Sequence, residues 1–146
     1  MPVTDAQVAA LRAYLANDWE LHQKLISQLD RAEAGKGYTA LITAAFVAAV
    51  QRHFGKSSSQ ADIVTYVGDV RSRSERVAEA LDPEVGERVI GVVVGDATTQ
   101  GIGREAKMGA QATLLTALIL DEHLDEAGLD AFLADARSTA DKMMGG

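Results

Sequence analysis

Two stretches of the chain contain no charged residue, and their hydrophobic positions extend around most of a helix. The first runs from Gly37 to Gln51 and the second from Met108 to Leu120. A helix that is apolar on nearly all sides is normally buried by other elements. The pattern therefore predicts an all-α fold with two largely uncharged central helices, over residues 37–54 and 104–121.

A third apolar pattern begins near the N-terminus, where Thr4 and Gln7 have the spacing of a capping box. Apolar residues then recur every three or four positions and predict one helix over residues 5–33. The sequence Ala-Gly-Lys-Gly at residues 34–37 is expected to end it. Such a helix would be about 43 Å long at 1.5 Å per residue, longer than a compact domain of this size readily covers.

Three further helices are expected from caps and periodicity. Ser59 with Asp62 predicts the start of a helix whose apolar face continues to Leu81, and Asp82-Pro83 predicts the next start. Another helix is expected from about residue 127, with inward-facing side chains at Leu129, Phe132, Leu133 and Ala136. The chain, residues 1–146, is thus expected to form a single helical domain of about six helices.

The composition is that of an ordinary globular domain. Of the 146 residues, 47% are hydrophobic and 24% are charged, which is sufficient for a packed core without disulfides. The absence of cysteine rules out thiolate ligands and cysteine nucleophiles in this chain. The N-terminus lacks a signal-peptide pattern, and both uncharged stretches are shorter than the ~20 residues of a membrane span. We expect a soluble, cytoplasmic protein, with no membrane partner, and residue usage typical of a GC-rich bacterial genome.

The net charge of −7 is unevenly distributed. Residues 1–73 hold eight basic and seven acidic side chains, whereas residues 74–146 hold six and fourteen. An acidic surface repels nucleic acid and anionic membranes, so nucleic acid is an unlikely partner on this evidence. The acidic half is interpreted as a solvated face of an acidic protein.

Residues 88–121 resemble a dinucleotide-binding fingerprint on paper. Residues 88–95 are rich in valine and fit either a strand or a helix, and Gly101 and Gly103 follow in a Gly-x-Gly-x-x-Ala sequence. Six residues separate the valines from Gly101, however, and the chain offers no clear partner strands. We therefore interpret residues 95–103 as a loop between helices, and no cofactor is expected.

Asp18 and His22 are the most notable polar pair. The spacing of the predicted helix over residues 5–33 places them in the middle of its apolar stripe, one turn apart. A carboxylate beside an imidazole raises its basicity, which suits proton transfer or half of a metal site. The further ligands that zinc or a di-iron centre needs are missing, so no metal is expected and the pair is interpreted as structural.

No complete catalytic set is present, and whether the chain is an enzyme stays open. The favoured hypothesis is a non-enzymatic helical protein that acts by self-association or by binding a partner protein. A homodimer is expected because a long first helix would project Leu25, Ile26 and Leu29 beyond its own domain.

Two alternatives remain. One is a small-molecule sensor or enzyme with an apolar pocket between helices, lined by the polar residues Thr43, Tyr66, Thr113 and Thr116. The other is a helix-turn-helix DNA-binding protein whose basic surface would consist of Lys56, Arg71, Arg73 and Arg76. Acidic residues interrupt that basic surface, which disfavours DNA.

Overall fold

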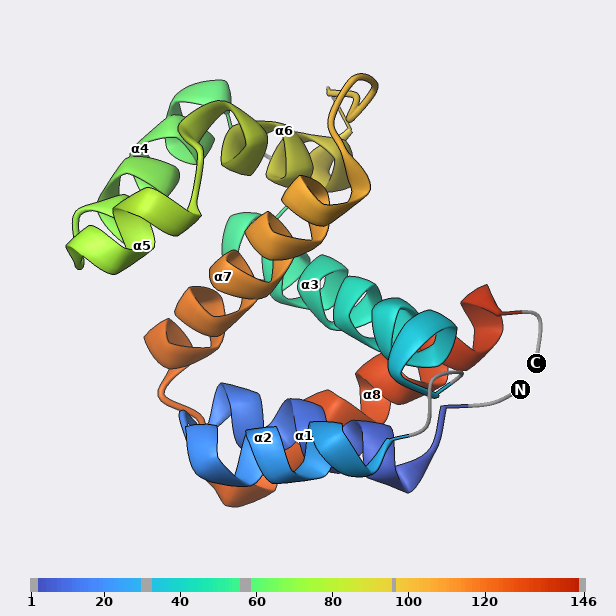
Figure 1. Ribbon diagram of the computed structural model, residues 1–146. Helices are drawn as coiled ribbons and strands as arrows, with labels where there is room; N and C mark the ends of the chain where they lie inside the picture. Colours follow the sequence, from blue (N-terminus) through green and yellow to red (C-terminus); the bar gives the residue numbers. More distant parts are fainter. Residues whose placement is uncertain (1–2, 30–32, 56–58, 96, 145–146) are drawn as a thin grey trace. The chain divides into compact units, whose positions relative to one another are not determined.

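A computed structural model describes residues 3–29, 33–55, 59–95 and 97–144, and every element in these ranges is helical (Figure 1). The all-α fold class is confirmed for this part of the chain. None of its helices is both long and apolar enough to cross a lipid bilayer. The elements are α1 (Asp5–Leu15), α2 (Trp19–Gln28), the π-helical turn η1 (Glu33–Gly37), α3 (Tyr38–Phe54), α4 (Gln60–Arg71), α5 (Glu75–Ala80), α6 (Pro83–Val94), α7 (Arg104–Glu122) and α8 (Glu126–Met143).

The chain forms two compact units. Unit 1 consists of Met1–Ala45 and Ile119–Gly146, and unit 2 consists of Phe46–Leu118. The boundaries fall inside α3 and α7, so each of these helices contributes one part to each unit. The expectation of a single domain stays a prediction.

The continuous helix predicted over residues 5–33 is wrong, because the chain breaks after α1. Asn17 adopts a left-handed conformation with φ of 64°, which ends the helix. Asp18 then caps α2, its carboxylate accepting a hydrogen bond from the Leu21 backbone N–H at 3.2 Å. The predicted stop at residues 34–37 is replaced by η1, which leads directly into α3, while residues 30–32 lie outside the described ranges.

A second break divides the helix predicted from Ser59 to Leu81. α4 ends at Arg71, and the Ser74 hydroxyl accepts a hydrogen bond from the Val77 N–H to start α5. The apolar spacing continues across both breaks, so periodicity alone joins helices that polar capping separates. These two breaks account for eight described α-helices where about six were expected.

The other predicted helix starts are confirmed. Capping boxes form at Thr4 with Gln7 and at Ser59 with Asp62, and Asp82 caps α6 with Pro83 in its first turn. The valine-rich residues 88–94 are helical, and Gly95 ends α6 in the left-handed conformation. The strand interpretation of this segment is therefore wrong.

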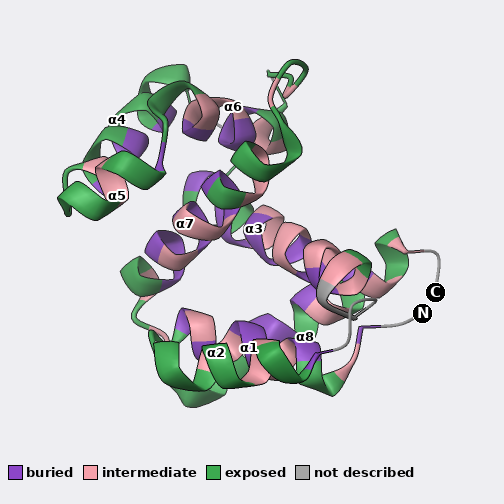
Figure 2. Ribbon diagram, in the orientation of Figure 1, coloured by how far each residue is buried: buried purple, intermediate pink, exposed green. Residues whose placement is uncertain are grey.

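The two uncharged stretches supply much of the described core (Figure 2). Leu41, Ala45 and Val50 of α3, and Leu114 and Leu115 of α7, have no exposed surface. In α8 the predicted inward residues are all buried: Leu129, Phe132, Leu133 and Ala136. Each uncharged stretch thus buries part of its circumference, whereas other apolar positions in it, such as Ile42 and Val47, are only partly buried.

In unit 1, two exposed ion pairs connect α1 and α8 and show that the two helices are antiparallel. Arg137 of α8 binds the Asp5 carboxylate at 2.5 Å, and Arg12 of α1 binds Asp130 at 2.8 Å. Arg12 lies seven residues after Asp5 in α1, and its partner Asp130 lies seven residues before Arg137 in α8, as expected for antiparallel helices. Arg137 also donates to the Val3 carbonyl, and the Val3 N–H donates to Asp141 at 2.6 Å.

In unit 2, the segment that follows α6 folds back onto that helix. The Arg88 guanidinium donates hydrogen bonds to the carbonyls of Thr98 and Gln100, both at 2.8 Å. Gly91 allows the close approach, because a Cβ atom added to it would lie 2.7 Å from Cβ of Ala97. This loop thus presents carbonyl oxygens to a cation, the opposite of the N–H groups that bind a phosphate.

We expect Gly91→Ala to lower the free energy of unfolding by about 1–3 kcal/mol, because the added methyl group overpacks this contact. Gly68→Ala is the matched control. Gly68 also lies inside a helix of unit 2, but an added Cβ meets nothing within 4 Å. That substitution should raise the free energy of unfolding by about 0.5–1 kcal/mol, because alanine loses less conformational entropy than glycine when the helix folds. Urea unfolding of both variants provides the measurement, and equal shifts would contradict the proposed packing.

Candidate functional site

The three residues that the sequence suggested for a polar site lie in different units. Asp18 and His22 belong to α2 in unit 1, whereas Tyr66 belongs to α4 in unit 2. Each part is therefore considered separately. Two of the described hollows lie close to candidate residues, one beside the end of α1 in unit 1 and one beside Tyr66 in unit 2.

Asp18 is exposed at the start of α2 and acts as its cap, so its predicted place in an apolar stripe is wrong. The break after α1 is the reason, because it changes the rotation of every later residue in the predicted helix. Asp18 and His22 are joined through the backbone, where the His22 N–H donates to the Asp18 carbonyl at 2.9 Å.

The His22 ring lies in an aromatic cluster instead. Its centroid is 5.2 Å from that of Tyr14 and 6.4 Å from that of Trp19. Nε2 lies 3.4 Å from the Tyr38 hydroxyl, at the start of α3. Nδ1 is buried and has no hydrogen-bond partner in the described structure. Sequence reasoning selected His22 but missed Tyr38, because sixteen residues and a helix boundary separate the two.

Burial shifts the pKa of both His22 and Tyr38. It lowers the pKa of His22 below its usual 6.5, because the charged imidazolium loses solvent. It raises the pKa of Tyr38 to about 12, with the nearby Tyr14 as a second cause. Both side chains are therefore neutral at neutral pH.

This geometry is better suited to packing than to catalysis. A general base must present a nitrogen to its substrate within hydrogen-bonding distance. In His22, Nδ1 is closed off from solvent and Nε2 faces Tyr38. The cluster fixes α2 on unit 1, at the cost of one unsatisfied nitrogen.

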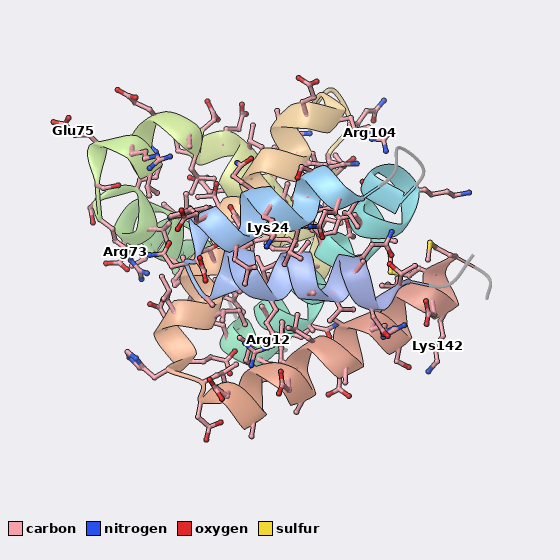
Figure 3. All side chains as sticks on the ribbon, turned by 60° about the horizontal axis from the view of Figure 1, so that its bottom comes forward. Arg12, Lys24, Arg73, Glu75, Arg104 and Lys142 are labelled. Atoms are coloured by element: carbon pink, nitrogen blue, oxygen red, sulfur yellow. The ribbon has the colours of Figure 1, made fainter. Side chains whose placement is uncertain are left out.

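The hollow in unit 1 is a groove of about 340 Å³ at the end of α1. Apolar side chains from both sides of the turn between α7 and α8 line it, and charged side chains lie at its rim. Its lining residues are Arg12, Leu15, Ala16, Ile119, Leu120, His123, Leu124, Asp125, Glu126 and Leu129. Figure 3 labels Arg12, whose side chain lies between α1 and α8. We call this hollow the α1–α8 groove.

The hollow in unit 2 has a volume of about 470 Å³ and surrounds Tyr66. It is lined by His53, Phe54, Asp62, Thr65, Tyr66 and Asp69, from the end of α3 and one face of α4. We call it the Tyr66 pocket. Of the four residues expected to line an apolar pocket, Tyr66 does so here, whereas Thr43, Thr113 and Thr116 are not part of this lining.

Two of the four basic residues proposed for DNA binding have other contacts. The Arg71 guanidinium donates to the carbonyls of Leu81 and Ala78, and Arg73 forms an ion pair with Asp69 at 2.9 Å. Lys56 lies outside the described residues, and Arg76 is exposed on α5. Two of the expected phosphate ligands thus have a structural role in unit 2.

Among the residues that the structure describes, no group of three His, Asp or Glu side chains is arranged to hold a metal ion. Neither a protein-family model, a curated protein nor a solved structure matches this chain.

The lowered pKa of His22 predicts a pH-dependent stability. The unfolded chain binds a proton more readily than the folded one, so His22 contributes its full stability above pH 6.5 and loses it as the pH falls below that value. We expect the free energy of unfolding to fall between about pH 7 and pH 5.5, where ordinary carboxylates are still ionised.

The measurement is urea unfolding of wild type and His22→Phe across this range. The variant should have a flatter profile because it has no imidazole to protonate in the aromatic cluster. His53→Phe makes the same substitution at an exposed histidine of unit 2 and is the control for the loss of an imidazole. Identical slopes for wild type and His22→Phe would show that burial of His22 does not influence folding.

Proposed function

We propose that this protein is a non-enzymatic helical protein that associates with a second copy of itself through α2 and the neighbouring α1–α8 groove. The observation that carries the proposal is the exposure of α2. Five successive positions around one half of this helix hold Trp19, Leu21, His22, Leu25 and Ile26, yet no residue of α2 is buried (Figure 2). Trp19 is 46% exposed and Leu21 is 43% exposed.

An amphipathic helix normally buries its apolar half. α2 packs against α1, and this contact covers Leu25 and Ile26 only in part. Leaving a tryptophan and a leucine in water on one short helix is unfavourable, and large exposed apolar patches are typical of interaction surfaces. Leu25 and Ile26 are two of the three residues from which a dimer was expected, and the third, Leu29, is buried.

The α1–α8 groove extends the apolar surface of unit 1. Leu120 at its edge is 52% exposed, and Ala16, which lines it, belongs to the turn that leads into α2. A hollow with an apolar floor gives a partner side chain a place to be buried, which is how anchor residues contribute most of the affinity of an interface.

Charge favours a second copy as the partner. Both signs occur in the lining of the groove: Arg12 is basic, and Asp125 and Glu126 are acidic. In a two-fold dimer the same patch meets itself, so it must contain both halves of every ion pair. Residues 74–146 are strongly acidic elsewhere and would repel their own copy.

Trp19 is the only tryptophan of the chain, and therefore reports directly on this surface. On dilution from high to low concentration, we expect its emission to shift to the red as the dimer separates and the indole becomes solvated. Sedimentation equilibrium on the same samples gives the dissociation constant.

Leu21→Gln should raise that constant about tenfold, because the dimer loses the half-exposed leucine twice. Val92→Gln is the matched control, since Val92 is 44% exposed in unit 2 and should leave association unchanged. A strict monomer at high micromolar concentration, or equal effects of the two substitutions, would refute the proposal.

A further inference from the structure

We propose that the Tyr66 pocket binds a positively charged nitrogen group, an ammonium or a guanidinium carried on a short organic stem. This inference concerns unit 2 alone and is independent of the self-association proposed for unit 1. It rests on the shape of the pocket, on its aromatic residues, and on the sign of its charged residues.

The aromatic residues of the pocket contact one another at its centre. The ring of Tyr66 lies 4.5 Å from that of His53 and 5.6 Å from that of Phe54, centroid to centroid. Phe54 and Tyr66 meet edge to face, at 86°, and both are buried, so they form the floor. His53 is exposed and forms a wall. Aromatic faces carry negative electrostatic potential and attract cations within about 6 Å.

The charged residues of the pocket are both carboxylates. Asp62 and Asp69 stand seven residues apart on α4, with Tyr66 between them, so the three share one face of the helix. No lysine or arginine belongs to the described lining. Carboxylates repel an anionic ligand and attract a cation, and at the Asp69 end a cation would have to compete with Arg73.

The protein itself shows that this rim binds a guanidinium. Nη2 of Arg73, in the turn that follows α4, donates to Oδ2 of Asp69 at 2.9 Å. Figure 3 labels Arg73. Asp62 is used differently: its Oδ2 accepts a hydrogen bond from the Ser59 N–H at 3.0 Å in the capping box, and no ion pair of Asp62 is among those described. Arg73 is thus an internal competitor at one end of the pocket.

The size of the hollow is consistent with this ligand class. A volume of about 470 Å³ is within the range of small-ligand sites. Thr65, exposed between the two carboxylates, adds a hydroxyl that can accept a hydrogen bond from an N–H group. Ammonium and guanidinium ions combine a charge that the carboxylates attract with a surface that packs on aromatic rings.

The test uses the full chain and follows the ring-proton resonances of His53 and Tyr66 by NMR. Titration with arginine amide and, separately, with tetramethylammonium chloride should move these resonances in a saturable way, at millimolar ligand. Sodium acetate at the same ionic strength should not. A protonated imidazole would repel the ligand, so the titrations are made at about pH 8. Tighter binding of arginine amide would indicate that the natural ligand is an arginine side chain of a peptide. Tighter binding of tetramethylammonium would indicate that it is a free organic cation.

Two substitutions should have opposite effects. Asp69→Asn removes a carboxylate and should weaken binding about two- to fivefold, the value of an exposed ion pair. Arg73→Gln removes the internal competitor and should tighten binding by a similar factor. Arg76→Gln is the control, because it makes the same change in charge at an exposed arginine outside the pocket.

Circular dichroism first establishes that each variant is folded. The proposal is overturned if neither cation gives saturable shifts, if acetate moves the same resonances equally, or if Arg73→Gln and Arg76→Gln act alike.

Discussion

Burial of the uncharged stretches within α3 and α7 is the interaction on which both compact units depend. Each helix contributes its first part to one unit and its second part to the other. The side chains with least exposure include Leu41 and Phe46, on the two sides of the boundary in α3, and likewise Leu118 and Ile119 in α7. A charge introduced at one of these buried positions would therefore be removed from solvent.

Local sequence signals predicted most of the helix starts, because a capping side chain and the N–H it binds are only three residues apart. Thr4, Ser59 and Asp82 are examples. The breaks at Asn17 and Ser74 were missed because apolar spacing continues through them. A single left-handed asparagine costs little, so the choice between one helix and two depended on packing that the sequence does not display.

The candidate sites were less predictable for the same reason. His22 was selected for an acidic neighbour, but the break after α1 turns its ring toward Tyr38, sixteen residues away. Tyr66 was expected among threonines of other helices, and it lies instead among residues of its own helix and the end of the preceding one. Residue types indicated where polar chemistry was concentrated, whereas the rotation of each helix decided which side chains meet.

The discontinuity of unit 1 has a consequence for biosynthesis. The ion pair between Asp5 and Arg137 joins segments that are made at different times, with all of unit 2 translated between them. At a bacterial or eukaryotic ribosome those 73 intervening residues (Phe46–Leu118) take roughly 4–15 s to add. During that interval α1 has no α8 to cover it, whereas unit 2 is already contiguous. For these seconds Asp5 and Arg12 lack their partners on α8, and this side of α1 is open to chaperones.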